Sequence, residues 1–215
     1  MKTTRKPGVQ ARLGRRQIDA CHANLGKSQL TGPSPYLGNE LSAAEIHQAI
    51  VETRVLADES ATQALACALA AQPAMGNAYI ELQGDLGAGK TTLVRHLLRA
   101  LGVGGRIKSP TYAVVESYET SGLNPGQHPN LHIWHFDFYR FSDPREWEDA
   151  GFRDIFASSG LKLAEWPDKA AGLVPRADLV LALQVQTDES RLLTLRAQTP
   201  AGASLLRGLP PREPT

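Results

Sequence analysis

The sequence predicts an α/β fold: a three-layer sandwich with a central mixed, mostly parallel sheet and helices on both faces. Three observations lead to this prediction. An apolar strand pattern at residues 78–82 runs into a glycine-rich loop, and a helical pattern at residues 92–101 follows. Strand and helix patterns then succeed one another to residue 197, as in sheets whose strands are joined by helices. The 215 residues, 42% of them hydrophobic, suffice for one such core with additional segments.

The glycine-rich loop carries the most specific pattern in the chain. Residues 84–91 read Gly-Asp-Leu-Gly-Ala-Gly-Lys-Thr, a complete phosphate-binding P-loop. Glycines lack a Cβ atom, so consecutive backbone N–H groups can converge on phosphate oxygens, and the following helix adds the positive end of its dipole. Lys90 can then reach the β- and γ-phosphates, and the Thr91 hydroxyl is placed to bind Mg²⁺. Because a strand precedes the loop and a helix follows it, we favour a nucleotide-binding, P-loop NTPase-type domain over an ordinary strand-to-helix turn.

The N-terminal residues differ in composition from the rest of the chain. Residues 1–50 contain seven Lys or Arg and three Asp or Glu, whereas the remainder contains sixteen and nineteen. This composition predicts a basic, disordered extension, which is either dispensable or a nucleic-acid-binding arm. We expect the P-loop domain over residues 53–208 and a frayed tail over residues 209–215. A short amphipathic helix is predicted over residues 42–55, and a second helix, capped by Asp58 or Ser60, extends through Ala70.

Further elements are predicted after the P-loop helix. Residues 113–118 and 131–138 read as two strands separated by a loop or hairpin tip that contains Gly, Asn and Pro. A helical, acidic stretch begins at Asp143, and residues 160–166 form a compact strand that ends in an acid. Residues 178–185 and 191–197 are predicted to be the last two strands.

The charge and hydropathy of the chain argue against several classes of protein. The net charge is +1, and the mildly acidic P-loop domain shows no basic stretch that would grip tRNA. No apolar run is long enough to cross a bilayer, and the basic N-terminus lacks the apolar region of a secretory signal. It also lacks the serine content and apolar helical face typical of an organelle transit peptide. We therefore expect a cytoplasmic protein with no membrane partner.

Two acids stand at the ends of predicted strands. Asp137 follows one apolar stretch and Glu165 follows another. The carboxyl ends of parallel strands meet at the edge of the sheet where the P-loop lies, so either acid could approach Thr91 and a Mg²⁺ ion. His135 and Lys162 interrupt the apolar runs expected of buried strands. The alternative is that each acid is an ordinary exposed or capping carboxylate.

Residues 109–112 read Ser-Pro-Thr-Tyr and have two interpretations. Small hydroxyl residues beside a rigid proline, shortly after the P-loop helix, are typical of a switch loop that senses the γ-phosphate. The alternative is a proline-initiated entry into the next strand.

Four motifs occur in an order that resembles the TsaE (YjeE) family. They are the P-loop at 84–92, Lys-Ser-Pro-Thr-Tyr at 108–112, His-Phe-Asp-Phe-Tyr-Arg at 135–140 and Glu-Trp at 165–166. Members of that family are bacterial ATPases required for threonylcarbamoyladenosine formation on tRNA. The resemblance, which extends over residues 53–198, implies a small P-loop fold, ATP and Mg²⁺ as cofactors, and slow hydrolysis by the chain alone. It also implies action with the TsaB–TsaD pair, in which TsaD transfers the group, so that tRNA is reached only through the complex.

The resemblance further implies roles for individual residues. Lys90 would neutralise the phosphates, Thr91 and Glu165 would bind Mg²⁺, and Asp137 would position the attacking water directly or through a metal-bound water. Trp166 would line the nucleotide site, the alternative being a half-buried indole that only packs. The nucleotide-binding residues that the resemblance implies are Thr62, Gly84, Gly87, Ala88, Gly89, Lys90, Thr91, Thr92, Trp166, Lys169 and Arg191.

Two other functions remain open at this point. A small-molecule or nucleoside kinase would need an acceptor pocket and a lid that supplies arginines, and only Arg145 and Arg153 lie between Arg140 and Glu165. A nucleotide-gated binding module would use ATP to order residues 109–112, and hydrolysis would be incidental.

Overall fold

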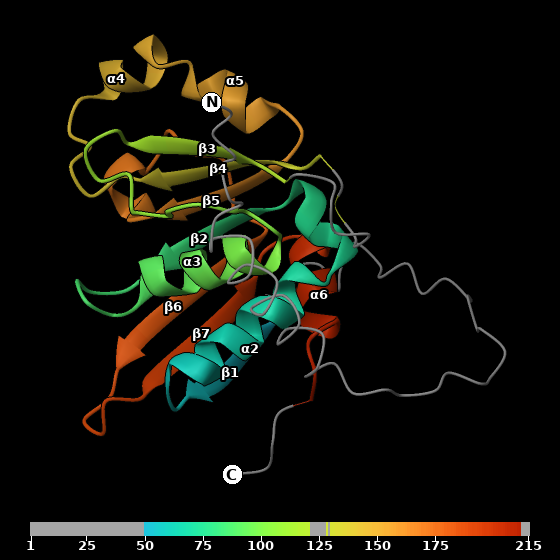
Figure 1. The fold of residues 1–215 in the computed structure, drawn as a ribbon. Coiled ribbons are helices and arrows are strands. Elements are labelled where there is room, and N and C mark those ends of the chain that lie inside the picture. The colour runs from blue at the N-terminus through green and yellow to red at the C-terminus, as the bar shows by residue number, and fades with distance from the viewer. Residues whose placement is uncertain (1–49, 121–127, 129, 212–215) are drawn as a thin grey trace, which may run out of the picture.

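The structure, a computed structural model, describes residues 50–120, 128 and 130–211 (Figure 1). The expected extension, apart from Ile50, and residues 212–215 of the expected tail lie outside these ranges. No helix in the described ranges is long and apolar enough to cross a membrane. The elements are β1 (Val51–Leu56), α2 (Glu59–Ala70), η2 (Pro73–Asn77), β2 (Tyr79–Gln83), α3 (Lys90–Ala100), β3 (Val115–Glu119), β4 (His132–Asp137), α4 (Pro144–Asp149), α5 (Phe152–Ala157), β5 (Leu161–Glu165), η3 (Pro167–Ala170), β6 (Leu179–Val185), β7 (Arg191–Ala197) and α6 (Pro200–Arg207).

The described strands form one seven-stranded sheet in the order β1-β7-β6-β2-β5-β4-β3 (Figure 1). The four central strands, β6, β2, β5 and β4, run parallel to one another. At the two ends, β7 and β1 on one side and β3 on the other pair antiparallel. The predicted α/β fold with a mixed sheet is confirmed, and its parallel part is the buried centre, where both faces are covered.

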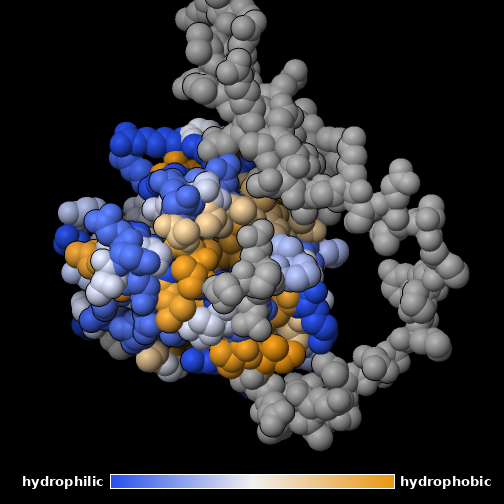
Figure 2. Space-filling view, turned by 90° about the horizontal axis from the view of Figure 1, so that it is seen from below, coloured by the Kyte–Doolittle hydropathy of each residue, from blue (hydrophilic) through white to orange (hydrophobic). Residues whose placement is uncertain are grey.

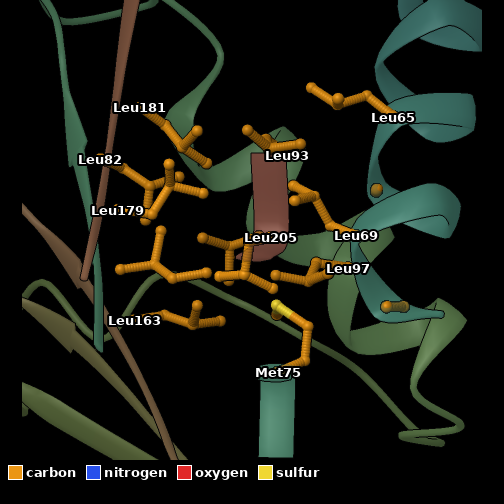
Figure 3. Packing of buried hydrophobic residues seen from close by; sticks show 14 of the residues in the cluster. Leu65, Leu69, Met75, Leu82, Leu93, Leu97, Leu163, Leu179, Leu181 and Leu205 are labelled. Carbon is orange, nitrogen blue, oxygen red and sulfur yellow. The ribbon is translucent and has the colours of Figure 1, made fainter. Parts of the chain in front are cut away.

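Two apolar cores cover the opposite faces of this sheet. The first joins α2, α3 and α6 to leucines of β2, β5 and β6, and Figure 3 shows Leu82, Leu163 and Leu181 meeting Leu93 and Leu205 there. The second is aromatic and lies under α4 and α5, with Phe136, Phe138, Trp147 and Phe152 among its members. Adjacent residues of one strand enter different cores, as Tyr79 and Ile80 do in β2, because side chains alternate between faces. The expected three-layer arrangement is therefore present.

The segment expected to be a helix over residues 42–55 is a strand where the structure describes it. Val51–Leu56 forms β1, which pairs antiparallel with β7, and residues 42–49 lie outside the described ranges. The local pattern alternates, since Val51, Thr53 and Val55 are exposed while Glu52 and Arg54 are partly buried. A period of two belongs to a strand, and the partner that stabilises it lies some 140 residues further along the chain.

Three other features differ from the sequence-based expectation. The strand expected from residue 113 begins at Val115, because residues 110–114 form a turn in which the Val114 N–H donates to the Pro110 carbonyl at 2.7 Å. Helix α6 was not expected, although its signals are present. The Thr199 hydroxyl accepts from the Gly202 N–H as an N-cap, and a proline occupies the first helical position. Leu209, the first residue of the expected tail, is buried in the first core.

Candidate nucleotide-binding site

The P-loop connects the central strand β2 to the N-terminus of α3. Gly84, Gly87 and Gly89 have φ values of 135°, 83° and 106°, a region that other residues rarely adopt. Space is also limiting at Gly84, because a Cβ atom there would overlap the backbone carbonyl oxygen of Leu183 in β6. Gly89 caps α3 without a side-chain hydrogen bond, so no side chain of the cap competes for the first N–H groups of the helix. Those groups are the anion-binding end of a helix.

Lys90 lies inside the loop and is 4% exposed. Its Nζ donates to the carbonyl oxygens of Gly84 at 2.6 Å and Asp85 at 2.9 Å. The same atom lies 3.8 Å from the centroid of the Trp166 ring. Burial lowers the pKa of the Lys90 ammonium, and the neighbouring carboxylates, Glu165 first among them, oppose that shift. The loop thus holds a partly desolvated cation where phosphate oxygens would lie.

Thr91 and Glu165 are joined directly, as their proposed shared role requires. The Thr91 hydroxyl lies 2.9 and 2.8 Å from the two carboxylate oxygens of Glu165, which is 2% exposed. His135 Nε2 lies 2.9 Å from Oε1 of the same carboxylate. The His135 ring is fully buried, and its Nδ1 has no hydrogen-bond partner among the residues that the structure describes. Side chains from α3 and β4 therefore meet at one buried carboxylate from β5.

Asp137 ends β4 directly beside Glu165, its register partner at the end of β5. Its Oδ2 accepts hydrogen bonds from the hydroxyls of Ser109 and Thr111, the latter at 2.7 Å. Its Oδ1 accepts from the Tyr139 N–H at 3.0 Å. The Ser-Pro-Thr-Tyr segment is therefore tied to the second strand-end acid, which favours the switch-loop interpretation over a simple strand entry.

Aromatic side chains border the loop on the β4 and β5 side. Trp166 follows β5 in a left-handed conformation with a φ of 57°, and its ring lies 5.0 Å from the Tyr139 ring. Tyr112 is exposed, and the Arg140 guanidinium lies 4.4 Å from its ring centroid. Trp166 thus contacts both Lys90 and Tyr139, and its place in a nucleotide site stays a prediction.

The other residues predicted from the sequence differ in how closely they are connected to the loop. Ala88 is buried within the loop, and Thr92 follows Thr91 in the first turn of α3. Arg191 in β7 borders the loop, since its Nε lies 4.0 Å from the position of a Cβ atom at Gly89. The Thr62 hydroxyl donates at 3.2 Å to the Asp58 carbonyl of its own helix. Lys169 is exposed in η3.

His135 is the site residue whose role the sequence did not indicate. In the sequence it only interrupts an apolar strand, but the structure places it on the same face of β4 as Asp137, against Glu165. The signal was its spacing, because residues two apart in a strand share a face. A polar residue two positions before a strand-end acid therefore points toward the same site.

The donor set fits a Mg²⁺ ion that shares its ligands with a nucleotide. Mg²⁺ is usually held by one or two carboxylates together with substrate phosphates and waters. The hydroxyl of Thr91 and the carboxylate of Glu165 supply this kind of partial shell. Among the described residues, no group of three or more His, Cys, Asp and Glu side chains is gathered as a complete cage.

Comparisons with known proteins give one consistent result. A family model described as "Threonylcarbamoyl adenosine biosynthesis protein TsaE" matches residues 56–193. The "tRNA threonylcarbamoyladenosine biosynthesis protein TsaE" of Haemophilus influenzae is 42% identical over 127 residues, which are 59% of this chain and 75% of that protein. The protein of the same name from Bacillus subtilis is 33% identical over 136 residues, 63% of this chain and 79% of that one. The "Crystal structure of Bacillus subtilus YdiB" has a similar fold, with a TM-score of 0.56 and 24% identity over 75% of this chain and 95% of that one.

Proposed function

Because the chain belongs to the TsaE family of tRNA threonylcarbamoyladenosine biosynthesis proteins, we propose that it is a Mg²⁺-dependent ATPase that serves this modification. The observation that supports the proposal most strongly is the bond between the Thr91 hydroxyl and both oxygens of Glu165. It joins the P-loop to a buried acid at the end of a parallel strand, as a metal-assisted phosphate site requires. Lys90, close to both, supplies the cation for the phosphates.

Each group at the site has a distinct task in the proposed reaction. The N–H groups at the start of α3 and the Lys90 ammonium hold the phosphates of ATP. Thr91 and Glu165 hold the Mg²⁺ ion, which when bound neutralises charge on the phosphate oxygens. Asp137 orients the attacking water, after its carboxylate exchanges one hydroxyl partner of the switch loop for that water. His135 holds the Glu165 carboxylate in place.

The proposed partner is the TsaB–TsaD pair, and tRNA is contacted only through that complex. In this arrangement the chain does not transfer the threonylcarbamoyl group itself. The charge of the P-loop domain supports this division of labour, since residues 51–215 carry more acids than bases and their net charge does not favour contact with tRNA phosphates. The proposed role in tRNA modification supports a cytoplasmic location.

The test is ATP hydrolysis by the purified full chain, alone and with its host's TsaB–TsaD pair and tRNA. We expect slow turnover alone, faster turnover with the pair, and modified tRNA only when all components are present. Lys90→Ala should lower turnover by about a hundredfold or more, because the phosphates lose their buried cation. Arg95→Ala removes an exposed cation from the same helix and should leave turnover unchanged.

Three other outcomes would count against the proposal. Normal turnover in Lys90→Ala would remove the P-loop from the reaction. Phosphorylation of a small acceptor by the chain alone would indicate a kinase. A variant that no longer hydrolyses ATP could still bind the partner pair in an ATP-dependent way and support normal tRNA modification. That result would indicate a nucleotide-gated binding module.

A further inference from the structure

Strand β1 is the outermost strand of the sheet, and one of its edges has no strand partner among the described residues (Figure 1). The Ala197 N–H of β7 donates to the Ile50 carbonyl at 2.9 Å. Hydrogen-bonded pairs recur every second residue in an antiparallel pair, so Glu52 and Arg54 also direct their backbone groups toward β7. Thr53, with Val51 and Val55 on either side, directs its backbone N–H and C=O away from the sheet.

The sequence of this strand suits antiparallel pairing with a second copy of itself. Residues 51–55 read Val-Glu-Thr-Arg-Val, so that an acid and a base are equidistant from the central Thr53. Val51 and Val55 are 53% and 57% exposed and lie on one face of the strand. Glu52 and Arg54 lie on the other face, where their side chains form a 2.7 Å ion pair and are 21% and 15% exposed. Figure 2 views the side of the molecule on which β1 lies in Figure 1, and apolar patches are visible there among hydrophilic residues.

We propose that β1 pairs antiparallel with β1 of a second copy of this chain, about a twofold axis at Thr53, to form a homodimer with one continuous sheet. In this register Thr53 faces Thr53, Val51 faces Val55, and Glu52 faces Arg54 of the other copy. All the backbone groups that would pair across the axis belong to residues whose N–H and C=O point away from β7. An interface of this kind is isologous, because the same surface is used twice.

Charge selects this register over its neighbours. A slip that centres the axis on Glu52 would place Glu52 opposite Glu52, and a slip that centres it on Arg54 would place Arg54 opposite Arg54. Like charges directly opposite one another in a sheet are unfavourable, whereas opposite charges are favourable. The two copies would therefore align valine with valine on one face and acid with base on the other.

The dimer would leave the nucleotide site accessible. β1 is separated from β2, which carries the P-loop, by β7 and β6. The proposal therefore goes beyond the ATPase function and does not depend on it. It also gives a role to an exposed strand edge, which proteins otherwise cover or protect because it favours aggregation.

The test measures the mass of the full chain by sedimentation equilibrium, with charge-swap variants. The wild-type chain should dimerise with a Kd below about 100 μM. Glu52→Lys places two bases opposite one another at each end, and Arg54→Glu places two acids there, so each variant alone should dimerise at least about tenfold more weakly. An equimolar mixture of the two should form a heterodimer, because the introduced lysine then faces the introduced glutamate and the native Arg54 of one copy faces the native Glu52 of the other. The double variant Glu52→Lys with Arg54→Glu should regain the homodimer.

Glu116→Lys, a charge reversal on the opposite edge strand β3, is the matched control and should not alter the dimer. Thermal unfolding of every variant checks that the fold is retained, and the double variant keeps the test decisive if one single variant fails to fold. A monomeric wild-type chain would overturn the proposal, whether the edge is bare or covered by another part of the same chain. A dimer that neither charge reversal weakens, or single variants that do not associate when mixed, would overturn it as well.

Discussion

Glu165 is the residue through which most of the site is connected. Its buried carboxylate accepts a hydrogen bond from the Thr91 hydroxyl and contacts His135. An ionised group at such a depth is costly unless it is paired and hydrogen-bonded, and these two partners offset part of that cost. If Glu165 binds Mg²⁺ as proposed, His135 is placed to orient its carboxylate, as a second group that contacts a metal ligand usually does.

Glu165→Gln is expected to separate nucleotide binding from turnover. Glutamine keeps the shape and can still accept from Thr91, but it lacks the negative charge that holds Mg²⁺. We expect ATP affinity within about threefold of wild type and Mg²⁺-dependent turnover lowered by about a hundredfold. Equilibrium binding of a non-hydrolysable ATP analogue and a Mg²⁺ titration of turnover measure the two effects. Glu116→Gln, on exposed β3, serves as the control, and a Mg²⁺ titration unchanged by Glu165→Gln would remove that residue from the metal site.

Lys162 provides a test of pH dependence away from the site. Its Nζ donates to the Ser158 carbonyl and lies 5.1 Å from the centroid of the Trp134 ring. Burial lowers the pKa of this lysine below its ordinary 10.5. Between the lowered value and 10.5 the unfolded chain binds more protons than the folded one, so this lysine makes the protein more stable as pH rises through that window.

Lys162→Met removes this contribution. The free energy of unfolding of the variant should therefore fall relative to that of the wild type as pH rises toward 10.5. This change is expected whatever the difference in stability between the two proteins at pH 7. Urea unfolding of both proteins at neutral and at alkaline pH measures the change. If the stability difference between the two proteins stays constant with pH, or if the variant gains stability relative to the wild type, the lowered pKa of Lys162 would be contradicted.

At the residue scale, the sequence predicted which side chains lie together wherever a motif fixes the spacing. Lys90, Thr91 and Glu165 come together as expected, because the P-loop and the ends of parallel strands have few alternative arrangements. The contacts of His135 were not predictable in the same way, since they depend on which strand lies beside β4. The place of Thr62 relative to a nucleotide remains a prediction.

At the scale of single elements, the P-loop is shaped by the strand beside it. Gly84 and Gly87 both have positive φ, but only Gly84 is pressed against the β6 backbone at Leu183. Around a Cβ atom at Gly87, apart from Gly87 itself and its two chain neighbours, the described part of the chain places no heavy atom within 4 Å. A side chain at Gly87 is therefore opposed only by the backbone conformation, whereas one at Gly84 is also opposed by lack of space.

Gly84→Ala should be clearly more destabilising than Gly87→Ala. Both variants incur about 1 kcal/mol for a side chain at positive φ. At Gly84 the overlap with a backbone carbonyl should add about 1–3 kcal/mol, because a strand cannot move aside as a side chain can. Chemical denaturation without nucleotide gives the two free energies of unfolding. Equal losses would show that the Leu183 carbonyl yields at little cost.

The limits of sequence-based assignment at this scale are visible in β1 and α6. β1 is a strand because β7 pairs with it, and that partner lies too far along the chain for a local pattern to reveal. α6 carries a threonine N-cap and a proline at its first position, so its sequence did contain the necessary signal. The first failure was therefore one of long-range information, and the second was a local signal left unused.

At the scale of the whole molecule, two cores share the same strands. β2, β5 and β6 each contribute residues to the leucine-rich core and to the aromatic core. Neither core can be lost while the other keeps its sheet, so we expect one cooperative unfolding transition. The three tryptophans, Trp134, Trp147 and Trp166, all belong to or pack against the aromatic core.

Tryptophan fluorescence therefore reports one core, and far-ultraviolet circular dichroism reports the whole sheet and its helices. In urea the two signals should give the same midpoint and the same slope. A fluorescence change that precedes the loss of circular dichroism would mean that the aromatic side unfolds first, and that the shared strands do not couple the two faces. The mixed sheet itself was predictable from the sequence, but its strand order was not, because the alternation of elements leaves several orders open.

The position of β2 has a consequence for how the protein is made. β2 is complete at residue 83, yet both of its neighbours come later, β5 from Leu161 and β6 from Leu179. Pairings between segments so distant close only after a long loop has been ordered, so they form slowly and late. A chain still emerging from the ribosome carries its complete P-loop sequence long before any strand can flank it. The phosphate-binding loop, read first in translation, is thus among the last parts of the domain to acquire its shape.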